Sequence, residues 1–176
     1  MKKRAVIITG PGYEDPEVIV PLLYLPAEGI TVDVATVAKE PDVAVVGKHG
    51  YPMKPTVKIG DLKVDNYDAV LLPGGYEAPD RVRQNQQAVL FIQEMFKAGK
   101  IISSVCHGPW ILCTADILKG KKATCYPGMK DDLIHAGATY ITDPVVIDGN
   151  LITSDRPEHS GWWTKVTIEA IRNQSK

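Results

Sequence analysis

The chain has 176 residues, a hydrophobic share of 44% and a formal net charge of −1. This length is enough for one domain with its own core, so we expect a single domain over residues 1–172 and a frayed tail at residues 173–176. Because no basic stripe interleaves with aromatic residues, we expect no nucleic acid and no membrane among the partners.

The first half of the chain alternates strand-like and helical runs. Residues 4–9 predict a strand, and the apolar run within it, residues 5–8, is too short for a signal peptide or a membrane span. Residues 16–28 predict a helix that Pro21 and Pro26 make irregular or kinked. The elements expected next are a strand at 31–36, a small hairpin excursion within 41–64 and a third core strand at 69–72.

The second half repeats this alternation after Pro73-Gly74-Gly75 closes the third strand. The elements expected there are a helix at 86–98 ended by Gly99, a strand at 101–105, a helix that begins at Gly108-Pro109, a helix at 129–136, a hairpin of strands 145–148 and 151–154 around Gly149-Asn150, and a last helix at 158–171. Strands that alternate with helices are typical of βαβ units, so we predict an α/β fold with a parallel sheet.

The most informative junction follows the strand at 101–105. That strand ends at Cys106, and Gly108 and Pro109 suit the first turn of a helix. A thiol at this position lies beside unpaired backbone N–H groups and the positive end of the helix dipole, which favour the thiolate. The junction therefore predicts a cysteine nucleophile.

The cysteine pattern also bears on the compartment. Cys106, Cys113 and Cys125 are odd in number and lack a Cys-x-x-Cys metal spacing. We therefore expect no disulfide framework, no metal site and a reducing cytoplasm. We interpret Cys113 and Cys125 as structural residues.

Residues that could take part in catalysis or ligand binding follow three of the predicted strands. In open parallel sheets, ligands bind outside the carboxyl ends of the strands near a switch point. If the sheet is doubly wound, residues 12–17, 73–75 and 106–108 meet in one cleft. Glu17 then faces Cys106, and the backbone N–H groups of Gly75 and His107 form an oxyanion site.

Several motifs in sequence order resemble the PfpI intracellular-protease family, which belongs to the superfamily of Parkinson disease protein seven and class I glutamine amidotransferase-like domains. They are Tyr13-Glu14-Asp15-Pro16-Glu17, Lys48-His49-Gly50-Tyr51, Leu72-Pro73-Gly74-Gly75, Ala78-Pro79-Asp80-Arg81-Val82-Arg83, Val105-Cys106-His107-Gly108-Pro109 and Tyr126-Pro127-Gly128-Met129-Lys130-Asp131-Asp132. The resemblance implies a flavodoxin-like three-layer sandwich with a mostly parallel central sheet and a nucleophile elbow at Cys106. It also implies a homodimer, often assembled into hexamers, with no metal or organic cofactor.

The same resemblance implies roles for individual residues. Cys106 is the nucleophile, Glu17 is a buried acid that hydrogen-bonds the sulfur, and His107 is a base or orienting group. Tyr126 matches a position near the catalytic cysteine and is a candidate substrate contact.

The family also supplies an acid from the neighbouring subunit, within a Pro-Gly-Gly-Arg-Ala-Pro-Glu pattern. The matching run here, residues 73–80, is one residue longer and ends in aspartate. Asp80 matches by the Ala-Pro-acid motif, while Glu77 could reach the site instead. The identity of this acid therefore stays open at the sequence level.

Two histidines and two carboxylates allow other interpretations. Adjacent side chains at a helix start diverge, so His107 could act on a neighbouring subunit or lend only its backbone N–H. His159 is a candidate late-position histidine, but the glutaminase-like His-x-Glu order is reversed here, which favours a capping or surface role. For Glu14 and Asp15, capping of the helix dipole is the simpler interpretation.

Three functions fit this pattern. In the preferred one, a glyoxalase or protein deglycase, Cys106 forms a hemithioacetal with a small aldehyde, and Glu17 and His107 transfer protons without glutathione. The second is an intracellular cysteine peptidase acting on peptides. The third is a redox-sensing stress-response protein in which Cys106 is oxidised to a sulfinate. The buried acid and the poorly aligned histidine suit a small aldehyde better than an amine leaving group.

Overall fold

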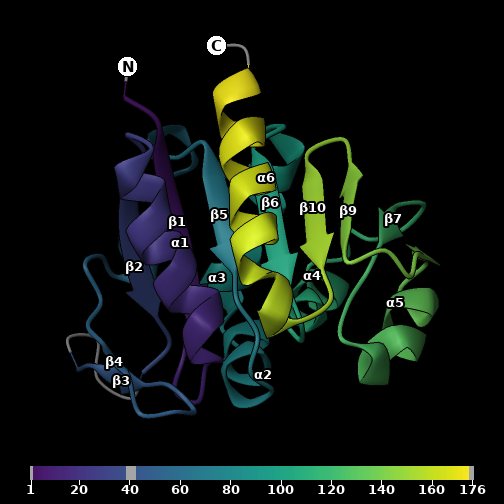
Figure 1. The fold of residues 1–176 in the computed structure, drawn as a ribbon, viewed down its shortest axis with the longest axis horizontal. Helices are drawn as coiled ribbons and strands as arrows, with labels where there is room; N and C mark the ends of the chain where they lie inside the picture. The colour runs from purple at the N-terminus through teal and green to yellow at the C-terminus, as the bar shows by residue number, and fades with distance from the viewer. Residues whose placement is uncertain (1, 39–42, 175–176) are drawn as a thin grey trace.

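The computed structural model describes residues 2–38 and 43–174. Its centre is a six-stranded sheet in the order β2-β1-β5-β6-β10-β9 (Figure 1). Every neighbouring pair is parallel except β10 and β9, which form the antiparallel hairpin at one edge. The strands are β1 (Arg4–Thr9), β2 (Thr31–Thr36), β5 (Ala69–Leu72), β6 (Ile101–Val105), β9 (Val145–Asp148) and β10 (Leu151–Ser154), with the bounds predicted from the sequence.

Helices cover both faces of this sheet, which gives three layers. On one face α1 (Asp15–Ala27) lies beside α6 (Ser160–Asn173), and their apolar side chains share a core cluster with β1 and β5 (Figure 1). The other face is covered by α2 (Glu77–Arg83), α3 (Gln86–Lys97) and α4 (Pro109–Thr114). The predicted flavodoxin-like α/β sandwich is therefore confirmed.

The central strands owe their position to burial on both faces. All residues of β5 and β6 are buried, as expected for parallel strands between two helical layers. The two serines within β6 are satisfied there: Ser103 Oγ lies 2.6 Å from Thr167 Oγ1, and the Ser104 hydroxyl donates to the Leu72 carbonyl at 3.1 Å. This pairing lets polar residues sit in the strand that leads to Cys106.

Smaller elements surround the sheet. The excursion between β2 and β5 contains the antiparallel pair β3 (Val45–Val46) and β4 (Pro52–Met53), which matches the predicted hairpin, although part of the predicted range lies outside the described residues. The remaining elements are the short helices η1 (Ile59–Asp61), η2 (Val64–Asn66), η3 (Pro127–Met129), η4 (Pro157–His159) and α5 (Lys130–His135), and the parallel pair β7 (Lys122–Ala123) and β8 (Thr139–Tyr140).

The structure departs from the predicted elements in four places. Helix α1 continues through both internal prolines, and α2 was not predicted because its seven residues include a proline. Helix α4 ends at Thr114, earlier than the apolar spacing suggested, because Asp116 has a φ of 53°. Residues 173 and 174 do not fray: Asn173 closes α6, and the Gln174 amide donates to the Gly99 carbonyl at 2.9 Å. Residues 175 and 176 lie outside the described part.

Within the residues described, none of the helices combines the length and apolar character that a membrane-spanning segment requires.

Candidate active site

The predicted cleft exists at the carboxyl ends of the central strands. The sheet order reverses between β1 and β5, so the loops that follow these strands lie on either side of the switch point. Glu17 follows β1, Gly74 and Gly75 follow β5, and Cys106 follows β6. A Cβ atom added at Gly74 would lie 2.8 Å from Cys106 Cβ, from Glu17 Oε2 and from the His107 backbone nitrogen, which shows how closely the three residues converge.

Cys106 occupies a nucleophile elbow. Its φ of 59° lies in the left-handed region, which residues other than glycine rarely adopt. Two backbone bonds hold this conformation: the Cys106 N–H donates to the Ser154 carbonyl at 3.0 Å, and the Cys106 carbonyl accepts from Tyr126 N–H at 2.9 Å. Gly108 lets α4 start against the Leu72 carbonyl, because any side chain there would overlap that oxygen. The turn therefore presents the sulfur toward the cleft.

Glu17 lies in the first turn of α1 and is fully buried. Its Oε2 accepts a hydrogen bond from the Gly74 backbone N–H at 2.5 Å. Burial raises the pKa of this carboxyl to about 8, although the Gly74 N–H and the Cys106 side chain act in the opposite direction. The carboxyl group is therefore neutral at pH 7 and carries a proton next to the sulfur.

The sequence predicts that the helix start favours the Cys106 thiolate, but in the structure the pKa of this thiol is raised. Burial, and then the charge of an ionised Glu17, raise the pKa of Cys106, and they outweigh the backbone N–H groups of His107 and Gly75, which lower it. The two N–H groups named in the oxyanion hypothesis therefore lie close to the sulfur, and their binding of a substrate oxygen stays a prediction. The two groups are coupled, because the charge of an ionised Glu17 raises the pKa of the thiol while the Cys106 side chain lowers the pKa of the carboxyl.

His107 contacts the sulfur directly, contrary to the prediction that the two side chains diverge. Its Nδ1 lies 3.3 Å from Cys106 Sγ. The reason is aromatic packing: the imidazole stacks on Tyr126 with centroids 4.7 Å apart and meets Trp110 edge-on at 5.0 Å. Burial, and then the Lys48 charge, lower the pKa of His107, so the ring is a neutral base at pH 7.

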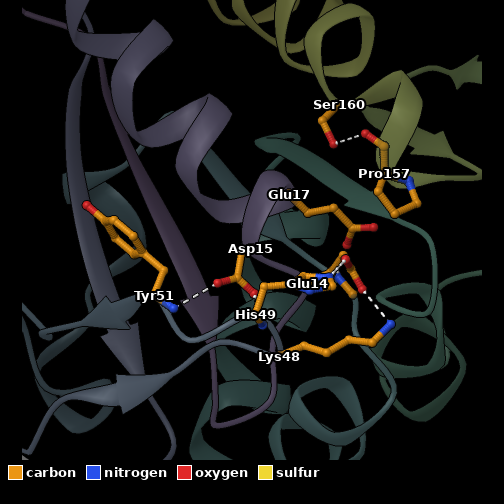
Figure 2. Close-up of polar contacts among 9 residues, drawn as sticks. Glu14, Asp15, Glu17, Lys48, His49, Tyr51, Pro157 and Ser160 are labelled. Carbon is orange, nitrogen blue, oxygen red and sulfur yellow. Dashed lines mark hydrogen bonds and ion pairs between the residues drawn. The ribbon is translucent and has the colours of Figure 1, made fainter.

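A second layer of the site was missed at the sequence level. Glu14 does not cap α1, and its carboxylate instead binds Lys48 Nζ at 3.2 Å and His49 Nε2 at 2.9 Å (Figure 2). Asp15 also has another role, because it accepts the backbone N–H groups of His49 at 2.8 Å and Tyr51 at 2.9 Å. The sequence signal for these contacts is the Lys-His-Gly-Tyr motif at residues 48–51, for which the family resemblance implies no role.

These residues surround a cavity of about 440 Å³. Its far wall comes from the start of η4, where the Ser160 hydroxyl donates to the Pro157 carbonyl at 2.6 Å (Figure 2). Glu17 lies beneath the cavity rather than on its wall. The lining residues are Glu14, Lys48, Gly75, Tyr76, Cys106, His107, Tyr126, Arg156, Pro157 and Glu158, of which Gly75, Cys106, His107 and Tyr126 were predicted as site residues.

Three predicted site residues do not line this cavity. Asp80 and Glu77 project from α2 toward a separate hollow, where Asp80 Oδ2 accepts from Gln84 Nε2 at 3.0 Å and Glu77 pairs with Arg81 at 2.8 Å. His159 is next to the cavity but does not line it, because its Nδ1 is held 2.6 Å from Asp155 Oδ1. Among the described residues, no group of three or more histidine, cysteine or acidic side chains is arranged to hold a metal ion.

Comparisons with known proteins agree with the family resemblance and with this fold. The model of the DJ-1/PfpI family matches residues 3–170. The chain is 38% identical to Deglycase PfpI of Pyrococcus furiosus over 169 residues (96% of this chain and 99% of that protein) and 36% identical to Putative cysteine protease YraA of Bacillus subtilis over 171 residues (97% and 99%). The crystal structure of Drosophila melanogaster DJ-1beta superposes with a TM-score of 0.91 at 29% identity, covering 99% of this chain and 92% of that one.

The close approach at Gly74 generates a first prediction. Gly74→Ala should lower the free energy of unfolding by about 1–3 kcal/mol and slow alkylation of Cys106, because the new methyl group overlaps the backbone and side chains that position the thiol. Denaturant unfolding and iodoacetamide kinetics measure both effects. Gly161→Ala in α6 is the matched control, since a Cβ there meets nothing within 4 Å. Equal behaviour of the two variants would contradict the proposed packing.

The neutral Glu17 carboxyl generates a second prediction. Its pKa rises from 4.5 to about 8 on folding, so the native state keeps a proton that the unfolded chain releases, and stability declines as the pH rises through this window. Glu17→Gln removes that decline. The variant should therefore gain stability over wild type with increasing pH, by as much as about 1.4 kcal/mol for each pH unit. Unfolding curves measured between pH 5 and pH 8 test this, and parallel profiles for the two proteins would refute it.

Proposed function

The chain belongs to the DJ-1/PfpI family, and from this membership we propose that it is a cysteine-dependent enzyme that converts small reactive aldehydes to hydroxy acids without glutathione. The observation that carries the proposal is the triple contact at the cavity floor. A thiol, a neutral imidazole 3.3 Å from it and a buried protonated carboxyl meet around one small cavity. This set can add a sulfur to a carbonyl and move protons on the adduct.

The reaction proceeds by an internal transfer of hydrogen within the substrate. The Cys106 sulfur adds to the aldehyde carbon of methylglyoxal, and the oxygen takes a proton to give a hemithioacetal. His107 removes the hydrogen from that carbon, and the electron pair moves onto the neighbouring carbonyl to give an enediolate. His107 returns its proton to the second carbon, and the hydroxyl proton moves to the oxygen of that carbon, which gives a thioester with a neighbouring hydroxyl group. Water then releases lactate and restores the thiol, so no external oxidant or reductant is consumed.

The name of the Pyrococcus furiosus relative supports a wider substrate range. An aldehyde bound to an amine in a glycated protein can be transferred to Cys106 and then follow the same steps, with release of the amine. The name of the Bacillus subtilis relative supports the alternative of a cysteine peptidase. We favour the aldehyde reaction because a peptidase needs a protonated imidazole to donate to the amine leaving group, whereas burial lowers the pKa of His107 and keeps the ring a neutral base.

We also propose a homodimer, assembled further into hexamers, as the working form. Asp80 and Glu77 line a hollow separate from the cavity of their own chain, which supports a role for one of them at the site of another copy. The mechanism needs a free thiol, and Cys106, Cys113 and Cys125 are all free, which is consistent with a reducing cytoplasm.

The decisive assay gives the purified protein methylglyoxal without glutathione. Wild type should form lactate, and Cys106→Ser should lose at least about 10³-fold in kcat, because the hydroxyl cannot replace the thiolate as nucleophile. Lactate production is measured directly, with a fluorogenic peptide tested in parallel. Equal, slow consumption by the two proteins would exclude the aldehyde reaction. Peptide cleavage that depends on Cys106 would favour the peptidase, and sulfinate formation without turnover would favour the redox sensor.

The subunit-crossing acid is tested by a pair of variants. If Asp80 serves the neighbouring site, Asp80→Ala should slow aldehyde turnover by roughly ten- to hundredfold, because a base without its orienting carboxylate transfers protons less efficiently. Glu77→Ala should remain near wild type, with its loss limited to an exposed ion pair with Arg81. Steady-state kinetics distinguish the two, and the reverse result would assign the role to Glu77.

A further inference from the structure

Lys48 brings a positive charge to the cavity without a role in the steps above. Two basic residues line the cavity in the described part of the chain: Arg156 pairs with Asp155 at 3.3 Å, and the Lys48 side chain is 50% exposed. Its ammonium group contacts the Glu14 carboxylate at 3.2 Å, on the side of the cavity formed by the loop after β1 (Figure 2). A half-exposed ion pair of this kind contributes little to stability, so its placement requires another explanation.

The backbone around Lys48 is fixed by the loop that leads to Glu17. The Lys48 N–H donates to the Tyr13 carbonyl at 2.8 Å, and the Gly12 N–H donates to the Val46 carbonyl at 2.8 Å. The Tyr13 hydroxyl donates to the Tyr51 carbonyl at 2.5 Å, and Asp15 accepts two further N–H groups from the same turn. The turn at residues 47–51 is therefore attached to the catalytic loop at both ends, which positions the ammonium relative to the thiol.

The charge of Lys48 acts on the reacting groups. It lowers the pKa of both Glu17 and His107, while the Cys106 charge raises the pKa of Lys48 itself. These mutual effects indicate that the ammonium lies within electrostatic range of the whole cavity floor. Any negative charge that develops on a bound substrate is therefore stabilised by the same group.

The proposed reaction creates one negative charge that the oxyanion donors do not serve. The backbone N–H groups of Gly75 and His107 act beside the sulfur, where the oxygen of the attacked carbon lies. In the enediolate step the charge develops on the oxygen of the neighbouring carbon, one bond further into the cavity. We propose that the Lys48 ammonium binds this second oxygen, which makes Lys48 a catalytic residue.

This assignment rests on the proposed aldehyde reaction, and it explains the Glu14 contact. Glu14 holds the ammonium at the cavity wall before the substrate arrives, so little reorganisation is needed when the enediolate forms. Because Lys48 acts on the enediolate rather than on sulfur addition, its loss should affect turnover and leave hemithioacetal formation intact.

The test compares Lys48→Met, Lys48→Arg and the control Lys54→Met, which removes an exposed lysine that does not line the cavity. Two quantities are measured: kcat for lactate formation, and the affinity for methylglyoxal from its protection of Cys106 against iodoacetamide. Lys48→Met should lose about 100-fold in kcat. Its protection constant should stay within about threefold of wild type, because the oxyanion donors remain. Lys48→Arg should keep about a tenth of the activity, since it retains the charge with altered geometry.

Two results would overturn the assignment of Lys48 while leaving the proposed function standing. One is an active wild type with an equally active Lys48→Met variant, and the other is a loss of protection as large as the loss of turnover. An inactive wild type is a different outcome, because it refutes the aldehyde reaction itself and the role of Lys48 with it.

Discussion

The carboxyl group of Glu17 is fully buried beside the Cys106 thiol, and the surrounding structure follows from the need to accommodate it. A buried carboxylate is costly, so the group stays protonated, and one backbone N–H from Gly74 satisfies its Oε2. This bond brings the end of β5 against the start of α1 and leaves no room for a side chain at Gly74. The turn after β6 can then approach closely enough to place the sulfur over the same glycine. Glu17 and Cys106 therefore meet at the switch point of the sheet.

Six strands and the meeting of their ends could be predicted from the sequence because the physical signals there are strong. Continuous apolar runs such as Ala69–Leu72 are typical of strands buried on both faces, and glycine or proline marks their ends. The position of Cys106 between a strand and Gly108-Pro109 predicts the elbow for the same reason. Glu17 could be placed near Cys106 because parallel strands end at one edge of the sheet.

The remaining parts depend on contacts between distant segments, which local patterns do not reveal. The ring of His107 turns toward the sulfur because Tyr126 stacks on it, and Tyr126 comes from another loop. Glu14 has the sequence position of a helix cap, yet its carboxylate instead contacts Lys48 Nζ at 3.2 Å and His49 Nε2 at 2.9 Å, both from a turn distant in sequence. His159 is removed from the cavity by Asp155, four residues earlier on the chain, which is a local signal that could have been used. Asp80 or Glu77 of α2 was predicted to serve the site of a neighbouring subunit, and the structure of a single chain does not contain that contact.

The site separates into a floor that is neutral at rest and a charged rim. Burial keeps Glu17 and the Cys106 thiol protonated and the His107 ring uncharged, whereas Lys48 and Glu14 form an ion pair at the wall. A small uncharged carbonyl compound can enter such a floor without desolvating an ionised group. In the proposed reaction, negative charge appears only during turnover, first on the oxygen beside the sulfur and next on the oxygen of the neighbouring carbon. Groups that already point at these two positions stabilise the reacting state more than the bound substrate, which is the condition for catalysis.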